Sequence, residues 1–346
     1  MPVNAPIEYF KAEEKFRSAK TREEKIKALE EMIRLLPKHK GSENLLRDLR
    51  KRLAKLRAQK EVKVTAKPKF VIKKEGAAQV CLVGFTNSGK STILKSLTNA
   101  KVEIASHPFT TTEPKVGMMN YEDVQIQLVE IPSTFDKDVM NIVRNCDGIV
   151  FLMDGTKDEK KQMEKLLEIM RRNKIKINEK PKKIKIEKRS NGIEIRGKNF
   201  LKGSIEEVRE ILQVSGYRNC LLVLQEEVSI DDVMDSLDRS LVYKNAIFIV
   251  TKVKELELEK IKEKIWKLVK LVRVYVKPIN KAKPEERPVT LPLNSTVKNL
   301  IKKLHREDLL KNFRFAKVWG KSVKHNFAKV GLEHILADKD IVEIHS

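Results

Sequence analysis

An eight-residue motif in the first third of the chain constrains the fold more strongly than any other feature. Residues 84–91 read Gly-Phe-Thr-Asn-Ser-Gly-Lys-Ser and fit the pattern G-x-x-x-x-G-K-[ST]. Such a loop works between a strand and a helix, because its curled backbone and the helix N-terminus turn N–H groups toward phosphate oxygens. The apolar run 80–83 predicts the strand, and residues 92–97 predict the helix. The sequence therefore predicts an α/β domain that binds a nucleoside triphosphate.

The residues of this motif have separate expected roles. Gly84 and Gly89 allow the backbone to curl, and Lys90 supplies the catalytic charge that bridges the β- and γ-phosphates. The Ser91 hydroxyl is the ligand that Mg²⁺ takes from such a loop. The residues expected to bind the nucleotide here are Gly84, Phe85, Thr86, Asn87, Ser88, Gly89, Lys90, Ser91 and Thr92.

A threonine run follows at the place of a first switch loop. Residues 108–112 read Pro-Phe-Thr-Thr-Thr and lie between the predicted loop helix and an alternating strand at 124–128. A threonine in this position can offer its hydroxyl to Mg²⁺ and its N–H to the γ-phosphate. Further strands of the α/β domain are predicted from apolar runs at 149–153 and 246–250.

The chain is strongly basic, with 72 Lys and Arg residues against 48 Asp and Glu residues and a net charge of +24. This excess favours a polyanionic partner, nucleic acid before membrane, although a heat-adapted protein also carries many surface charges. Residues 171–202 hold thirteen basic and three acidic residues, the densest positive stretch of the chain. Few aromatic residues accompany them, so we expect phosphate contacts with structured RNA or ribosomes and no DNA sequence specificity.

The same stretch alternates Ile with charged residues at 174–177, 183–186 and 193–196. The alternation predicts short antiparallel strands with Ile on the inner face, and Asn191-Gly192 predicts a tight turn. Five basic side chains would then point outward and meet phosphates together: Lys174, Lys176, Lys183, Lys185 and Arg196.

Two helices are predicted before the phosphate loop. Thr21 and Glu24 form a capping box ahead of an apolar stripe that ends at Pro37, and leucines at helical spacing follow over residues 45–56. The predicted domains are a helical hairpin at 1–62, the nucleotide-binding domain at 63–270 with a basic α+β insertion at about 171–245, and a compact mixed module at 271–346.

The spacing of the cysteines and the length of the apolar runs indicate the cellular compartment of the protein. Cys81, Cys146 and Cys220 are too far apart in sequence to form a CxxC pair, and no His lies at ligand spacing beside them. Nothing in the chain reaches eighteen consecutive apolar residues, and the N-terminus lacks the layout of a signal peptide. These observations predict a reduced, cytoplasmic protein with neither a membrane partner nor a structural zinc site.

The chain resembles the Obg-like GTPases and, within them, the archaeal-type DRG family (developmentally regulated GTP-binding proteins). The resemblance is carried by residues 84–85, 109–111, 129–132 and 241–243, and above all by the C-terminal stretches 272–275, 317–322 and 330–334. It implies an α/β P-loop domain of the Ras-like kind, an insertion similar to a ribosomal-protein domain, and a C-terminal TGS domain of β-grasp fold.

The resemblance also implies the ligands of the site. GTP and Mg²⁺ would bind there, with Thr111 as a catalytic switch residue and a second Mg²⁺ ligand beside Ser91. Thr251 and Lys252 would belong to the signature that recognises the base. Asn87 implies a monovalent cation, K⁺, held beside the phosphates.

Two signatures differ from the family pattern. The second switch of the family opens Asp-x-Pro-Gly, whereas residues 130–133 read Glu-Ile-Pro-Ser. Glu is one methylene longer than Asp and would crowd a water-mediated contact with Mg²⁺, and Ser133 has less backbone freedom than Gly. Lys254 stands where the family has the Asp that accepts from guanine N–H groups, and an ammonium group has no acceptor to offer.

Three functions follow from these observations. The favoured one is a slow, Mg²⁺-dependent GTPase that acts as a switch on RNA or ribosomes. The first alternative is an adaptor that binds RNA or ribosomes without significant hydrolysis, because Glu130 and Ser133 depart from the family. The second alternative is an Obg-like ATPase, because Lys254 replaces the guanine-reading Asp.

Overall fold

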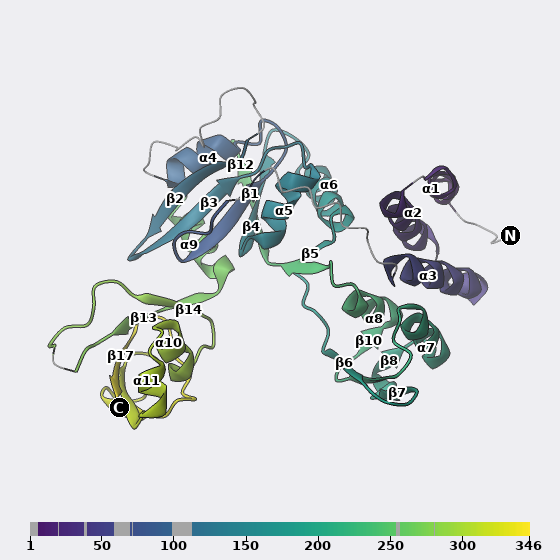
Figure 1. Cartoon of the computed structure of the whole chain (residues 1–346). Helices are drawn as coiled ribbons and strands as arrows, with labels where there is room; N and C mark the ends of the chain where they lie inside the picture. The colour runs from purple at the N-terminus through teal and green to yellow at the C-terminus, as the bar shows by residue number, and fades with distance from the viewer. Residues whose placement is uncertain are drawn as a thin grey trace. The chain divides into compact units, whose positions relative to one another are not determined.

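The computed structural model describes residues 6–19, 21–37, 40–58, 70, 72–98, 113–253, 257–279 and 281–346. These residues fall into two compact units that interleave along the chain (Figure 1). Unit 1 takes its residues from Met1–Lys67 and Lys174–Tyr243, and unit 2 takes its residues from Pro68–Asn173 and Lys244–Ser346. None of the helices in the described ranges has both the length and the apolar character needed to cross a membrane.

Unit 2 contains a five-stranded sheet in the order β12-β4-β1-β3-β2, in which only β2 is antiparallel to its neighbour. The strands are β1 (Ala78–Val83), β2 (Lys115–Tyr121), β3 (Val124–Glu130), β4 (Gly148–Asp154) and β12 (Ala246–Thr251). Every residue of β1 and β4 is buried, as central parallel strands require. The strands predicted from 80–83, 124–128, 149–153 and 246–250 are confirmed.

Helices cover both faces of this sheet (Figure 1). On one face lie α4 (Lys90–Leu97) and α9 (Leu258–Val269), which share a buried apolar cluster with β1. On the other face lie α5 (Lys137–Asn145) and α6 (Glu159–Arg172). A mostly parallel sheet between two helical layers confirms the predicted α/β phosphate-loop domain.

The C-terminal module follows α9 directly and has its own hydrophobic core. Its sheet has the order β14-β13-β17-β15-β16 and packs on α10 (Val297–Lys303), with α11 (Glu307–Lys311) alongside. The strands are β13 (Leu271–Val276), β14 (Val289–Pro292), β15 (Phe315–Trp319), β16 (Ala328–Val330) and β17 (Asp340–His345). This mixed sheet wrapped on a helix is the predicted β-grasp fold.

Unit 1 joins the N-terminal helices to the insertion through one hydrophobic core. Leu49, Leu212 and Leu222 come from three distant parts of the chain and lie in the same buried cluster. The helices are α1 (Ile7–Ser18), α2 (Arg22–Leu35), η1 (Lys40–Ser42), α3 (Glu43–Ala58), η2 (Lys198–Phe200), α7 (Ile205–Val214) and α8 (Ile230–Leu237). The capping box of Thr21 and Glu24 is present, whereas α1 has no counterpart in the sequence prediction.

The strands of the insertion pair differently from the prediction. β6 (Ile184–Lys188) and β7 (Ile193–Arg196) do not pair with each other, because β9 (Cys220–Leu224) lies between them. β5 (Ile175–Ile177) pairs with β11 (Val242–Lys244) in a separate sheet, and β8 (Leu201–Lys202) pairs with β10 (Val228–Ser229). The apolar run of β9 suits the central position, whereas strands with alternating charges suit the edges. The predicted hairpin around Asn191-Gly192 is therefore wrong.

A buried ion pair ties the N-terminal helices to the insertion and gives a stability prediction. Arg50 of α3 contacts Glu207 and Asp231, each at 3.0 Å, and the side chains of Arg50 and Glu207 are both 11% exposed. Arg50→Met leaves the Glu207 carboxylate buried without its partner. We expect the free energy of unfolding to fall by about 3 kcal/mol, measured by urea denaturation followed by circular dichroism.

Lys51→Met is the matched control. Lys51 is the next residue on α3, its side chain is 51% exposed, and it lies 3.7 Å from Glu210. We expect this change to cost less than about 1 kcal/mol. Equal losses in the two variants would show that the Arg50 ion pair does not hold the two parts of unit 1 together.

Candidate nucleotide-binding site

The phosphate loop runs from the end of β1 to the start of α4, and its glycines are required by the local geometry. A Cβ atom on Gly84 would lie 2.4 Å from Ser88 Oγ and 2.5 Å from the Leu152 carbonyl oxygen. Gly89 has a φ of +77°, in the left-handed region that favours glycine. The loop therefore curls as the motif predicts, with the N-terminus of α4 at its end.

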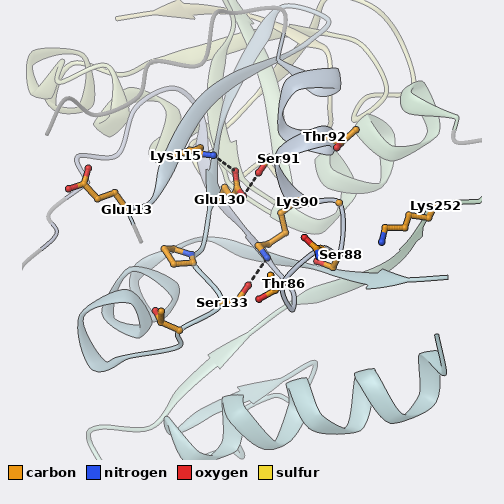
Figure 2. A pocket seen from close by; sticks show the side chains of 14 residues that line it. Thr86, Ser88, Lys90, Ser91, Thr92, Glu113, Lys115, Glu130, Ser133 and Lys252 are labelled. Carbon is orange, nitrogen blue, oxygen red and sulfur yellow. Dashed lines mark hydrogen bonds and ion pairs between the residues drawn. The ribbon is translucent and has the colours of Figure 1, made fainter. Parts of the chain in front are cut away.

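A cavity of about 750 Å³ opens beside this loop (Figure 2). It is lined by Thr86, Asn87, Ser88, Gly89, Lys90, Ser91, Thr92, Glu113, Lys115, Glu130, Pro132, Ser133, Thr134 and Lys252. Most of the residues predicted to bind the nucleotide are thus gathered around one space. Gly84, Phe85 and Thr251 do not line the cavity, and Thr111 and Lys254 lie outside the described residues.

Lys90 is held in place by three acceptors. Its Nζ donates to the carbonyl oxygens of Gly84 and Phe85, each at 2.9 Å, and to Ser133 Oγ at 2.8 Å. The residue is 7% exposed, and burial lowers the pKa of its ammonium group, while the Glu130 carboxylate acts in the opposite direction. Phosphate oxygens entering the cavity would compete with the Ser133 hydroxyl for this charge.

Ser91 and Glu130 form the second polar contact of the cavity (Figure 2). Ser91 Oγ donates to Glu130 Oε1 at 2.5 Å, whereas Glu130 Oε2 is buried without a hydrogen-bond partner. A hydroxyl and a carboxylate are oxygen ligands of the kind that Mg²⁺ takes from protein, with phosphates and water completing its shell. Among the described residues no three His, Cys, Asp or Glu side chains could hold a metal by themselves. Ser91 and Glu130 therefore fit a metal that arrives with the nucleotide.

The residues predicted to recognise the base lie at the end of β12. The Thr251 hydroxyl is buried within 2.9 Å of the Ser88 carbonyl and 3.0 Å of the Met153 carbonyl, so it braces the phosphate loop. Lys252 lines the cavity and pairs with Asp154 at 2.7 Å. This contact lowers the pKa of the Asp154 carboxyl strongly, so this carboxylate is charged at neutral pH.

Glu113, Lys115 and Thr134 also line the cavity, although no sequence motif indicated them as site residues. Lys115 is opposite Glu130 in the antiparallel register of β2 and β3, and its Nζ lies 4.0 Å from Glu130 Oε2. The one available signal was the position of Lys115 just after the predicted switch loop. A charge at a strand start is too common to identify a site.

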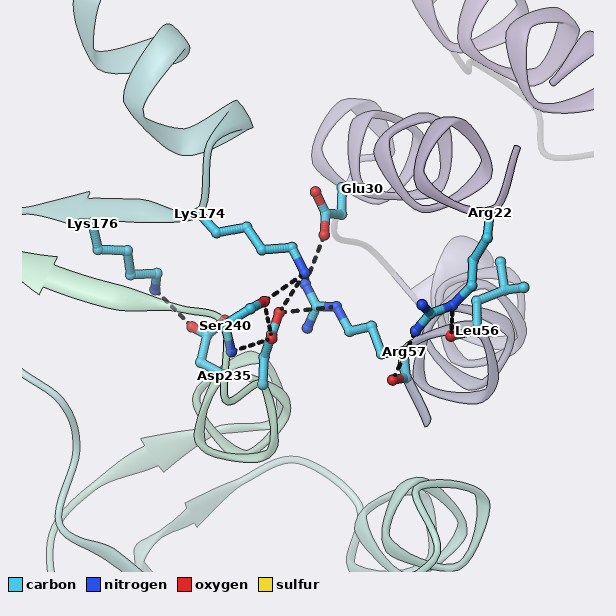
Figure 3. Close-up of polar contacts among 9 residues, drawn as sticks. Arg22, Glu30, Leu56, Arg57, Lys174, Lys176, Asp235 and Ser240 are labelled. Atoms are coloured by element: carbon cyan, nitrogen blue, oxygen red, sulfur yellow. Dashed lines mark hydrogen bonds and ion pairs between the residues drawn. The ribbon is translucent and has the colours of Figure 1, made fainter. Parts of the chain in front are cut away.

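Three of the five basic residues predicted to face RNA are paired with carboxylates. Lys174 pairs with Asp238 at 3.0 Å. Lys176 pairs with Asp235 at 2.7 Å (Figure 3). Arg196 pairs with Glu194 at 2.8 Å. Alternation predicted which face of a strand is polar, but acidic residues from α8 and the following turn neutralise part of that face. Lys183 and Lys185 are exposed, and no ion pair to them is found among the described residues.

The position of Lys90 gives a direct test of the cavity. We expect Lys90→Met to weaken triphosphate binding at least about a hundredfold, because it removes the buried charge that would meet the phosphates. Lys90 is buried, so the change needs a thermal-unfolding control. Lys95→Met, an exposed change on the same helix, should leave affinity unaltered in isothermal titration calorimetry. Equal affinities for Lys90→Met and the unaltered protein would exclude this cavity.

Comparison with known proteins places this geometry in a family. Residues 79–188 match the model of the 50S ribosome-binding GTPase, and residues 272–346 match the model of the TGS domain. An uncharacterized GTP-binding protein of Methanocaldococcus jannaschii is 30% identical over 93% of this chain and 92% of its own length. Developmentally-regulated GTP-binding protein 1 of Xenopus laevis is 29% identical over 80% of this chain and 84% of its own length. Ribosome-interacting GTPase 1 of Saccharomyces cerevisiae is 30% identical over 93% of this chain and 98% of its own length. The chain belongs to the DRG family of GTP-binding proteins, with a P-loop GTPase domain and a C-terminal TGS domain.

Proposed function

We propose that this protein is a slow, Mg²⁺-dependent GTPase that acts as a nucleotide-controlled switch on ribosomes or structured RNA. The observation that carries the proposal is the contact of Lys90 with Ser133 and of Ser91 with Glu130. These contacts join the phosphate loop to the residues that correspond to the second switch of the family. Phosphate binding at the loop would therefore change the partners of the switch residues, which is the coupling that a switch needs.

The chemistry follows from the groups around the cavity. Lys90 and the loop N–H groups would bind the β- and γ-phosphates and stabilise the charge that develops on them. When bound, Mg²⁺ neutralises further charge on the same oxygens. Residues 132–138 read Pro-Ser-Thr-Phe-Asp-Lys-Asp and contain no Gln that could position the attacking water. Intrinsic turnover is therefore expected to be slow.

One observation favours the alternative of an adaptor without significant hydrolysis. Ser133 donates to the Gly84 carbonyl at 3.1 Å and accepts from Lys90, so its side chain occupies the space that the glycine of the family would leave free. Binding and hydrolysis need separate measurements for this reason. Titration with fluorescent GTP, GDP and ATP measures binding, and single-turnover phosphate release measures hydrolysis, with Lys90→Met as the inactive reference.

The outcomes of these measurements separate the candidates. Tight GTP binding with slow phosphate release supports the GTPase switch. GTP binding without phosphate release above the Lys90→Met reference supports the adaptor, and preference for ATP over GTP supports the Obg-like ATPase. No binding of any of the three nucleotides would contradict the proposed function as a whole.

A monovalent cation is the second expectation for this site. Asn87 lines the cavity with a φ of +63°, so its side chain belongs to the loop that would surround the phosphates. No Arg is among the described residues that line the cavity, so a cation held there would supply positive charge at the phosphates. We expect GTP hydrolysis to be about tenfold faster in KCl than in NaCl. Asn87→Gly keeps the left-handed backbone and should lose the difference. Equal rates for the unaltered protein in the two salts would refute the role of K⁺.

Ribosome or RNA association is proposed from the charge of the insertion, with the TGS domain as a second contact. Lys183 and Lys185 lie at the edge strand β6, are exposed, and can meet phosphates without disturbing the core of unit 1. The relative from Saccharomyces cerevisiae is named for an interaction with ribosomes. The remaining basic residues of the insertion contribute less than their number suggests, because several are paired with carboxylates.

Charge reversal tests this surface. We expect Lys183→Glu with Lys185→Glu to weaken co-sedimentation with ribosomes and to lower the slope of log affinity against log salt by about 2. Affinity for GTP should stay the same. The control is Lys160→Glu with Lys161→Glu, an equal charge change at exposed positions of α6. If both double variants pellet like the unaltered protein at every salt concentration, β6 is only a solvated edge.

A further inference from the structure

Glu130 carries a carboxylate oxygen that none of the described residues satisfies. Oε1 accepts from the Ser91 hydroxyl at 2.5 Å, but Oε2 is buried and has no hydrogen-bond partner in the described structure. The side chain is 13% exposed, and the Lys115 ammonium lies 4.0 Å from Oε2. A buried anionic oxygen without a hydrogen bond is costly, so such an atom in a phosphate cavity points to a ligand.

We propose that Glu130 coordinates the Mg²⁺ of the bound nucleotide directly, in place of a metal-bound water. The inference rests on the proposed function, because the metal enters this cavity together with the nucleotide phosphates. It goes further because it assigns a coordination position on Mg²⁺ to the Glu130 carboxylate. A shorter side chain would leave this position to a water molecule.

The two oxygens of the Glu130 carboxylate support direct coordination. Oε1 accepts the Ser91 hydroxyl proton, which leaves the lone pairs of Ser91 Oγ free for Mg²⁺. Oε2 has no hydrogen bond in the described structure and is the oxygen left to coordinate the same ion. The Ser91 proton keeps its acceptor in this arrangement, and the unpartnered oxygen gains a ligand.

The length of the side chain explains why this arrangement differs from a water-mediated one. Glu130 ends β3, and its register opposite Leu82 of β1 fixes its Cα beside the start of the phosphate loop. From this fixed point the carboxylate of Glu130 reaches Ser91 Oγ. An Asp at the same position is shorter by one carbon–carbon bond, which leaves room for a water between the carboxylate and the metal.

Direct coordination has two opposite effects on nucleotide affinity. With Mg²⁺ present, the carboxylate adds a charged ligand to the metal and strengthens binding of the metal–nucleotide complex. With Mg²⁺ removed, the same buried carboxylate faces the phosphates and repels them. The effect of Glu130 should therefore change sign with the metal, which a purely structural role would not produce.

The first measurement is the affinity for a fluorescent, non-hydrolysable GTP analogue in Mg²⁺ and in EDTA. We expect Glu130→Gln to bind at least about tenfold more weakly than the unaltered protein in Mg²⁺ and at least about threefold more tightly in EDTA. Glu164→Gln is the matched control, because it makes the same charge change at an exposed position of α6 that does not line the cavity. It should change neither affinity. Thermal unfolding of each variant verifies that the fold is retained.

The second measurement counts the waters on the metal. Mn²⁺ replaces Mg²⁺ in the complex with the same analogue, and line broadening of the electron paramagnetic resonance signal by ¹⁷O-water reports the number of bound waters. We expect one water fewer in the unaltered protein than in Glu130→Asp. Equal numbers, or a Glu130→Gln effect of the same sign with and without Mg²⁺, would overturn direct coordination while leaving the proposed function intact. Failure of the unaltered protein to bind the analogue in either condition would overturn both.

Discussion

The carboxyl ends of parallel strands meet at one edge of a sheet, and the candidate site depends on this constraint. β1, β3, β4 and β12 all run in the same direction in unit 2. Their ends deliver the phosphate loop, Glu130, Asp154 and Thr251 to the same edge, although these residues are up to 167 positions apart in the chain. The site is thus a consequence of strand direction and strand order, and the loops need only extend a few residues from a buried frame.

The phosphate loop is braced from two sides within this frame. Close contact with Leu152 requires glycine at position 84, and the Thr251 hydroxyl contacts the Ser88 carbonyl. The first contact is with a backbone carbonyl of β4, and the second joins the side chain of the last residue of β12 to a backbone carbonyl of the loop. Both therefore hold the curl of the loop independently of its charged side chains. Lys90 contacts Ser133, just after β3, and Ser91 contacts Glu130, the last residue of β3; phosphate and metal would compete for these two contacts. In the proposed function, this separation of a rigid brace from exchangeable contacts would let a nucleotide act on the residues at the second-switch position.

In unit 1, tertiary contacts pair several basic residues with carboxylates, so the number of basic residues overstates the positive charge available to a partner. The insertion is the densest basic stretch in the sequence, but its strands lie against acidic residues of α8 and the turn after it. Lys174 and Lys176 consequently bind Asp238 and Asp235, while the N-terminal helices add Arg57, which lies 3.5 Å from the same Asp238 (Figure 3). Neutralised lysines serve the stability of the unit. The proposed contact with RNA or ribosomes is therefore assigned to residues at the edge of the unit, such as Lys183 and Lys185.

The sequence by itself determined the local elements and their chemistry. The G-x-x-x-x-G-K-[ST] pattern placed the phosphate loop between β1 and α4, and apolar runs located the strands that surround it, because both signals come from residues adjacent in the chain. Only the tertiary structure decided three other matters. β9 separates β6 from β7, the N-terminal helices share a core with the insertion, and Lys115 and Glu113 join the cavity. The reason is the same in each case: which strands pair, and which charges meet, depends on contacts between distant residues that no local pattern records.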